Sequence, residues 1–103
     1  MKIIEKLSER IDEEICDSKY YAKMALEYKE SYPTLADAFY NLSLSEMEHM
    51  NILHNEVVKI IEQYKKEHGE PPSDMLAIYN YLHGKEIEKA KDAKIYQTMY
   101  KEK

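Results

Sequence analysis

Apolar side chains recur at intervals of three and four residues in three long segments of the chain, and two short polar breaks separate these segments. The three stripes are Ile4, Leu7, Ile11, Tyr21 and Ala25; Leu35, Phe39, Leu42, Leu53, Val57, Ile60 and Tyr64; and Tyr79, Leu82, Ala90, Ala93 and Tyr100. This spacing puts one apolar face on each helix, and it predicts helices over about 3–31, 34–67 and 74–101. The chain is therefore predicted to be all-α, with three long antiparallel helices in one domain over residues 1–103.

Proline and glycine mark the two breaks. Pro33 disfavours a helical residue before it, and Thr34 followed by Asp37 is similar to a capping box, so the second helix is expected to start there. In the second break, Gly69 suits a helix C-cap and Ser73 suits the N-cap of the third helix. Because both breaks are short, consecutive helices are expected to fold back on one another.

Charged residues interrupt each apolar stripe. Glu14 lies on the stripe of the first helix, Glu46 and His49 lie on that of the second, and Glu86 lies on that of the third. An ionised carboxylate on a buried face is costly unless something compensates its charge, and a metal cation is a common compensator. These interruptions are therefore the candidate functional residues.

Glu14, Glu46 and His49 are predicted to meet in the middle of the bundle. Folding the first helix back about Pro33 places residue 14 opposite about residue 51, and His49 lies roughly 3 Å of helix rise from that level. Glu46 is one turn away on the same face. Glu13 points about 100° away from Glu14 around the helix, so Glu14 is the preferred ligand and Glu13 stays the alternative.

Two interpretations of these three residues remain open at this point. Glu46 and His49 form a Glu-x-x-His pair, which is a weak motif by itself because the chain is rich in glutamate. In the first interpretation, Glu14 joins this pair to bind metal. In the second, the three residues form a buried ion pair or hydrogen-bonded cluster that holds the register of the helices.

Composition narrows the classes of function. Apolar residues make up 44% of the chain and charged residues 34%, which suits amphipathic helices. The net charge of -5 argues against a nucleic-acid partner. No apolar run is long enough for a membrane span, and the N-terminal segment becomes charged too early for a signal peptide. The single cysteine, Cys16, offers no disulfide framework, so a reducing, cytoplasmic compartment is expected.

A second polar group is predicted between the second and third helices, where His54, Glu56, His83 and Glu86 gather at one level. A salt-bridge cluster is the preferred interpretation, and an auxiliary metal site is the alternative. The ten tyrosines of the chain are expected mainly to pack between helices with their hydroxyls at the surface.

The chain resembles the ferritin-like superfamily, and within it the rubrerythrins and encapsulated ferritins. The resemblance covers roughly residues 7–66 and rests on Glu14, Tyr21, the segment 35–43, and Glu46-Met47-Glu48-His49. It implies that Glu14 and Glu46 are metal-binding carboxylates of half a non-haem di-iron site, with Glu46 bridging and His49 a terminal ligand. Tyr20, Tyr21 and Tyr40 are expected around this site, and Tyr21 is the candidate catalytic residue, able to hydrogen-bond a ligand or to carry oxidising equivalents.

The chain departs from that family in its number of ligands. A complete ferritin-like bundle has four helices and a second set of Glu plus Glu-x-x-His, whereas the third predicted helix brings Ala93 to the level of the site. The resemblance therefore implies a homodimer or larger oligomer, in which two chains complete a four-helix bundle and share two iron ions. Manganese and zinc are alternatives for the metal, and one metal per chain is the alternative stoichiometry.

The function implied by this resemblance is a ferroxidase-type activity, in which bound Fe(II) is oxidised by oxygen or peroxide. The rival hypothesis comes from another class of protein. It is a metal-free helical interaction module that keeps the ferritin-like fold but not its chemistry, with Glu14, Glu46 and His49 as a buried polar network.

Overall fold

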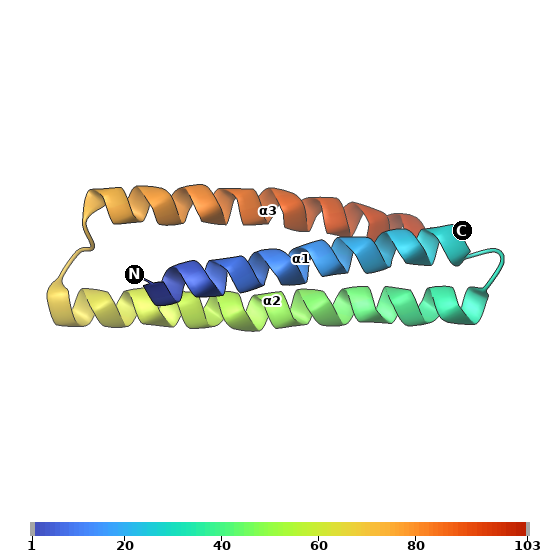
Figure 1. Cartoon of the computed structure of the whole chain (residues 1–103), viewed down its shortest axis with the longest axis horizontal. Coiled ribbons are helices and arrows are strands. Elements are labelled where there is room, and N and C mark those ends of the chain that lie inside the picture. The colour runs from blue at the N-terminus through green and yellow to red at the C-terminus, as the bar shows by residue number, and fades with distance from the viewer. Residues whose placement is uncertain (1, 103) are drawn as a thin grey trace.

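Three α-helices lie side by side in a rod that measures 56 × 19 × 18 Å (Figure 1). The structure, a computed structural model, describes residues 2–102, and at positions 74, 75 and 78 it describes the backbone alone. The helices are α1 (Lys2–Tyr28), α2 (Pro33–His68) and α3 (Ser73–Lys101), and α2 runs antiparallel to both others. The predicted all-α fold class and the three-helix bundle are confirmed.

The first break begins earlier than predicted and is longer, because it spans residues 29–32. Helix α1 ends at Tyr28, about three residues early, and α2 begins at Pro33 with Tyr32 at its N-cap. Proline suits the first helical position because its missing N–H has no partner to lose there. The predicted capping box at Thr34 was wrong, since Tyr32 takes the N-cap position and the cap has no side-chain hydrogen bond.

The second break follows the predicted chemistry at its start. Gly69 has a φ of 79° and caps α2 by donating its N–H to the carbonyl of Lys65 at 2.9 Å. Glycine adopts this backbone conformation without the steric cost that a Cβ would add. At the other end, Pro72 stands at the N-cap position and α3 begins at Ser73, so the predicted serine cap was wrong by one residue.

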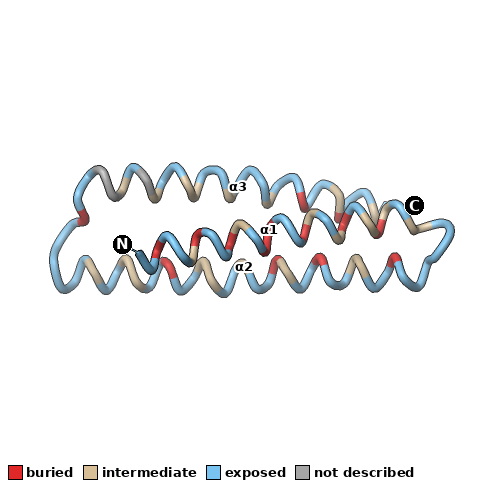
Figure 2. The backbone as a smooth tube through the Cα atoms, in the orientation of Figure 1, coloured by how far each residue is buried: buried red, intermediate tan, exposed pale blue. Residues whose placement is uncertain are grey.

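Helix α1 packs against both other helices, whereas α2 and α3 contact each other sparsely (Figures 1 and 2). Buried residues follow a seven-residue spacing along the seam between α1 and α2, with half-buried Met50 filling one position on α2. They are Ile4, Ile11, Ser18 and Ala25 on α1, and Ala36, Ser43 and Val57 on α2. Each fully buried large aliphatic side chain of this seam, such as Ile11 or Ile15, stabilises the fold by about 1.5–3 kcal/mol.

Over residues 2–102, no helix has the length and apolar character needed to cross a bilayer.

The register of α1 on α2 is set where Ser18 faces Ser43. The Ser43 hydroxyl donates to the carbonyl of Ser18 at 2.7 Å, and the Ser18 hydroxyl donates to the carbonyl of Ser43 at 2.8 Å. Stepping along both helices from this pair puts Glu14 opposite Met47 rather than residue 51. The shift of one turn arises because the turn is centred on residues 29–32 rather than on Pro33. It brings Glu14 to a level between Glu46 and His49.

Candidate metal centre

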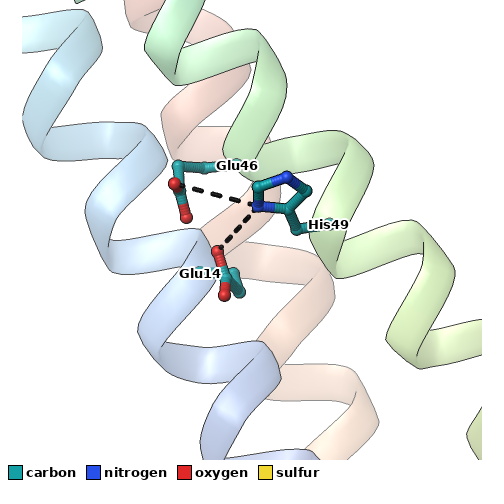
Figure 3. Close-up of side chains that lie close together, drawn as sticks. All are labelled: Glu14, Glu46 and His49. Atoms are coloured by element: carbon teal, nitrogen blue, oxygen red, sulfur yellow. Dashed lines mark ion pairs between the residues drawn. The ribbon is translucent and has the colours of Figure 1, made fainter.

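Glu14 on α1 and Glu46 and His49 on α2 point toward one another in the space between the two helices, which we call the groove (Figure 3). Each residue offers one ligand atom, and these atoms lie within 4.8 Å of one another. Nδ1 of His49 is 3.6 Å from Oε2 of Glu14 and 3.9 Å from Oε1 of Glu46. The predicted convergence of these three residues is confirmed, and their binding of metal stays a prediction.

Burial is graded across the group. The side chain of Glu14 is 5% exposed, that of Glu46 is 18% exposed and that of His49 is 55% exposed. The site is thus deepest at Glu14 and opens to solvent at His49. Oε2 of Glu14 is buried and makes no hydrogen bond to the described residues. A buried carboxylate oxygen without a donor is costly, and a cation in the groove would satisfy it.

The other oxygen of Glu14 is already paired. Nη2 of Arg10 lies 2.8 Å from Oε1 of Glu14, and Nη1 of Arg10 lies 2.6 Å from Oε2 of Glu13. Glu13 is exposed and makes this surface ion pair outside the group of convergent ligand atoms, so the alternative ligand is not brought to the site. Arg10 was missed at the sequence level, although its i, i+4 spacing from Glu14 is the signal that could have identified it.

The two carboxyl groups perturb one another. Interaction with the neighbouring carboxyl of Glu14, together with burial, raises the pKa of Glu46 to about 7. Interaction with Glu46, helped by the charges of Arg10 and His49, lowers the pKa of Glu14 against the opposing effect of burial. Two neighbouring carboxylates favour sharing one proton. A metal cation that replaced this proton would favour the ionised forms of both Glu14 and Glu46.

Tyr21, the predicted catalytic residue, is half-buried and packs against other aromatic rings. Its ring stacks on Phe39 with centroids 6.0 Å apart, and the edge of Tyr20 approaches it at 5.8 Å. Tyr21 lies two helical turns beyond Glu14 on α1. The structure therefore gives Tyr21 a packing role, and its catalytic role stays a prediction.

Two aromatic stacks join α2 to α3. The rings of Tyr40 and Tyr100 lie 4.9 Å apart at an interplanar angle of 21°, and those of His54 and His83 lie 4.8 Å apart at 17°. Tyr40, which the sequence placed near the site, therefore belongs to the contact with α3. Stacked aromatic pairs of this kind add roughly 0.5–1.5 kcal/mol beyond the burial of their area.

The second polar group forms only in part. His54, His83 and Glu86 line one cavity of about 180 Å³, whereas Glu56 is exposed and pairs with Lys59 at 3.2 Å. Burial, followed by the charge of Asp12, raises the pKa of Glu86 to about 7. Glu14, Glu46 and His49 are the three-residue group whose ligand atoms converge within the described part of the chain, and the group around His54 is not one.

Helix α3 passes behind the site and contributes buried Ala93 and Gln97 rather than a charged ligand (Figure 3). Figure 3 shows the side chains of Glu14, Glu46 and His49 between α1 and α2, with α3 behind them. One chain thus offers three ligands. Comparison with protein-family models finds no match, and no curated protein and no solved structure is significantly similar to the chain.

Proposed function

We propose that the protein binds iron through Glu14, Glu46 and His49 and acts as a non-haem di-iron protein of ferroxidase type. The observation that carries this proposal is the convergence of two carboxylate oxygens and one imidazole nitrogen within 4.8 Å of one another. The unpaired, buried Oε2 of Glu14 supports it, because the site contains a polar atom for which the described residues supply no donor. Carboxylate and imidazole ligands suit iron, and they also bind manganese or zinc.

We further propose that a second copy of the chain completes the site. Three ligands are about half of what a di-metal carboxylate site in a helical bundle requires. Helix α3 lies behind the three ligand side chains in Figure 3, and exposed apolar residues lie on the same helical stripe as His49: Leu35 is 45% exposed and Leu42 is 44% exposed. Pairing two such grooves would cover these leucines and bring two sets of Glu14, Glu46 and His49 together in a ferritin-like four-helix bundle.

The residues of the groove have separable roles in this proposal. Bound iron would supply one-electron chemistry toward oxygen or peroxide. Glu14 provides a fixed anionic ligand at the buried end, since its pKa is lowered, and Glu46 and His49 provide the outer ligands. Arg10 holds one oxygen of Glu14 and leaves the other oxygen directed at His49.

The rival is a metal-free helical module, and one observation favours it. Arg10 already compensates part of the charge on Glu14, with Nη2 of Arg10 2.8 Å from Oε1 of Glu14. A polar network of this kind can hold two helices in register without any ligand. The two hypotheses differ in what removal of a ligand does to metal binding.

Titration with Fe(II) under anaerobic conditions separates them. We expect the wild-type chain to bind Fe(II), and we expect Glu14→Gln and His49→Ala each to weaken that binding at least 100-fold, since each removes one of three ligands. Glu13→Gln and His68→Ala are matched controls, because both residues are exposed and lie outside the group. Equal affinity in all five proteins, or no binding in any, would refute the iron proposal and leave the metal-free module.

A further inference from the structure

A buried polar layer crosses all three helices one turn from the candidate site. It consists of Ser18 on α1, Ser43 on α2 and Gln97 on α3, and their exposed fractions are 0%, 0% and 9%. Each serine hydroxyl donates to the backbone carbonyl of the other serine. The amide Nε2 of Gln97 donates to the Ser43 hydroxyl at 2.8 Å and to the Ser18 hydroxyl at 3.2 Å. We call these three residues the serine–glutamine layer.

The layer is satisfied in one register. A slip of seven residues between α1 and α2 would place Ala36 or Met50 opposite Ser18, and neither side chain can accept or donate the hydrogen bonds that Ser43 makes. Buried hydroxyl and amide groups left without partners cost much more than apolar side chains in the same place. A buried polar layer of this kind therefore specifies the alignment of the two helices, as polar core positions do in coiled coils.

The candidate site depends on this alignment. Ser18 follows Glu14 by one helical turn, and Ser43 precedes Glu46 by three residues. A slip of one turn moves α2 by about 5.4 Å along α1, which is more than the 4.8 Å that spans the three ligand atoms. The same layer that aligns the helices thus determines whether the carboxylate of α1 reaches the ligands of α2.

Gln97 extends this control to α3. Both donors of its amide are used on the two serines, so α3 is tied to α1 and α2 at one shared level. Neighbouring Ala93 is fully buried, which lets α3 approach closely behind the site. Helix α3 supplies no ligand to the group, yet through this glutamine it contacts both helices that do.

We propose that Ser18, Ser43 and Gln97 are positioning residues that hold α1, α2 and α3 in the register at which Glu14, Glu46 and His49 form one metal-binding group. The inference rests on the proposed function for its metal readout. Its structural part, the control of register, stands on the hydrogen bonds of the layer alone and can be tested without metal.

The test replaces the whole layer by apolar residues of similar shape, in the triple variant Ser18→Ala, Ser43→Ala and Gln97→Leu. Because no buried group is left unpaired, the variant is expected to unfold at or above the denaturant midpoint of the wild-type chain. Its Fe(II) affinity is expected to fall at least tenfold. Val57→Ala truncates a buried side chain at the far end of the seam and is the matched control. It is expected to lower the denaturant midpoint and to leave the Fe(II) affinity unchanged.

The single variant Gln97→Leu keeps the reciprocal serine hydrogen bonds and is expected to weaken Fe(II) binding about threefold.

Register is measured separately by the distance between spin labels at Lys6 on α1 and Asn55 on α2, both exposed, in a Cys16→Ser background that removes the free cysteine. One narrow distance is expected with the layer intact, and a broadened or shifted distribution in the triple variant. Wild-type affinity together with one unchanged distance in the triple variant overturns the proposal. If the wild-type chain binds no Fe(II), the proposed function fails, and the spin-label distances alone decide the positioning role.

Discussion

Glu14 carries a carboxylate into the interior on a helix face that is otherwise made of apolar and small side chains. Its neighbours along that face include Ile11, Ile15 and Ser18, all buried. Arg10 compensates one oxygen of the carboxylate, and the second oxygen is left for whatever enters the groove beside His49. A protein that needed only a stable interface would gain by an apolar residue at this position, since buried charges are commonly retained at a cost to stability.

Because Glu46 faces the buried carboxylate of Glu14, we expect Glu46→Gln to stabilise the chain when no metal is present. At pH 8 the wild-type groove holds two facing carboxylates, whereas a glutamine amide can donate a hydrogen bond to Glu14. We expect the free energy of unfolding to rise by about 1 kcal/mol, and Fe(II) binding to be lost. Denaturant unfolding at pH 8 in the presence of chelator measures the first effect. A loss of stability would instead support a structural polar network, and Glu48→Gln, an exposed change on the same helix, is the control.

Glu86 makes a second prediction at the residue scale, because burial raises its pKa to about 7 from the ordinary value of 4.5. The folded chain then holds more protons than the unfolded chain between these values, so stability falls as pH rises through that window and levels off above about pH 7. Glu86→Gln removes this contribution, and its advantage over the wild-type chain should grow by about 1–2 kcal/mol from pH 4.5 to pH 7. Unfolding curves at several pH values measure it, with exposed Glu88→Gln as the control. A difference that does not vary with pH would contradict the assignment.

At the scale of the elements, the glycine cap of α2 could be predicted from the sequence, and the exact register between α1 and α2 could not. The glycine cap at Gly69 is a local property of one backbone conformation, and it was identified correctly. The end of α1 was placed three residues late, because Pro33 excludes helix only immediately before itself. The register was one turn off, since it depends on Ser18 meeting Ser43 across 25 positions of sequence.

The same distinction holds for the candidate site. Glu14, Glu46 and His49 could be predicted from helical spacing, because each interrupts an apolar stripe and all lie near one level. The ion pair of Arg10 with Glu14 was within reach of the same spacing rule but was not recognised. The stack of Tyr40 on Tyr100 and the hydrogen bonds of Gln97 could not be predicted, since both need the third helix to be placed on the other two.

Lys29 gives a prediction at this scale, because it joins the turn after α1 to the end of α3. Its ammonium donates to the carbonyls of Tyr100 and Glu102, each at 2.7 Å. A cation at a helix C-terminus satisfies carbonyls that lack helical partners and interacts favourably with the helix dipole. Lys29→Met keeps the apolar stem, and we expect it to cost about 1 kcal/mol and to speed amide hydrogen exchange in the last turn of α3. Lys94→Met, on the exposed face of α3, should change neither quantity, and equal exchange in both variants would contradict the role of Lys29.

At the scale of the whole molecule, the bundle is asymmetric. Helix α3 lies behind the α1–α2 pair in Figure 3, and Glu14, Glu46 and His49 lie in front of it between α1 and α2. A chain that functions alone would leave the half-exposed Leu35 and Leu42 uncovered beside a site with three ligands. A twofold partner on this groove would bury the leucines and double the ligands with a single contact. The proposed di-iron site and the proposed dimer therefore depend on the same surface.

The most direct test is the molar mass of the protein in solution together with its metal content per chain, measured by light scattering and elemental analysis after anaerobic loading with Fe(II). We expect a dimer or larger assembly with one iron per chain, and no retained iron in Glu14→Gln. A strict monomer with one tightly bound iron would contradict the shared site while sparing the ligands. A protein that retains no iron at any assembly state would contradict the metal centre itself.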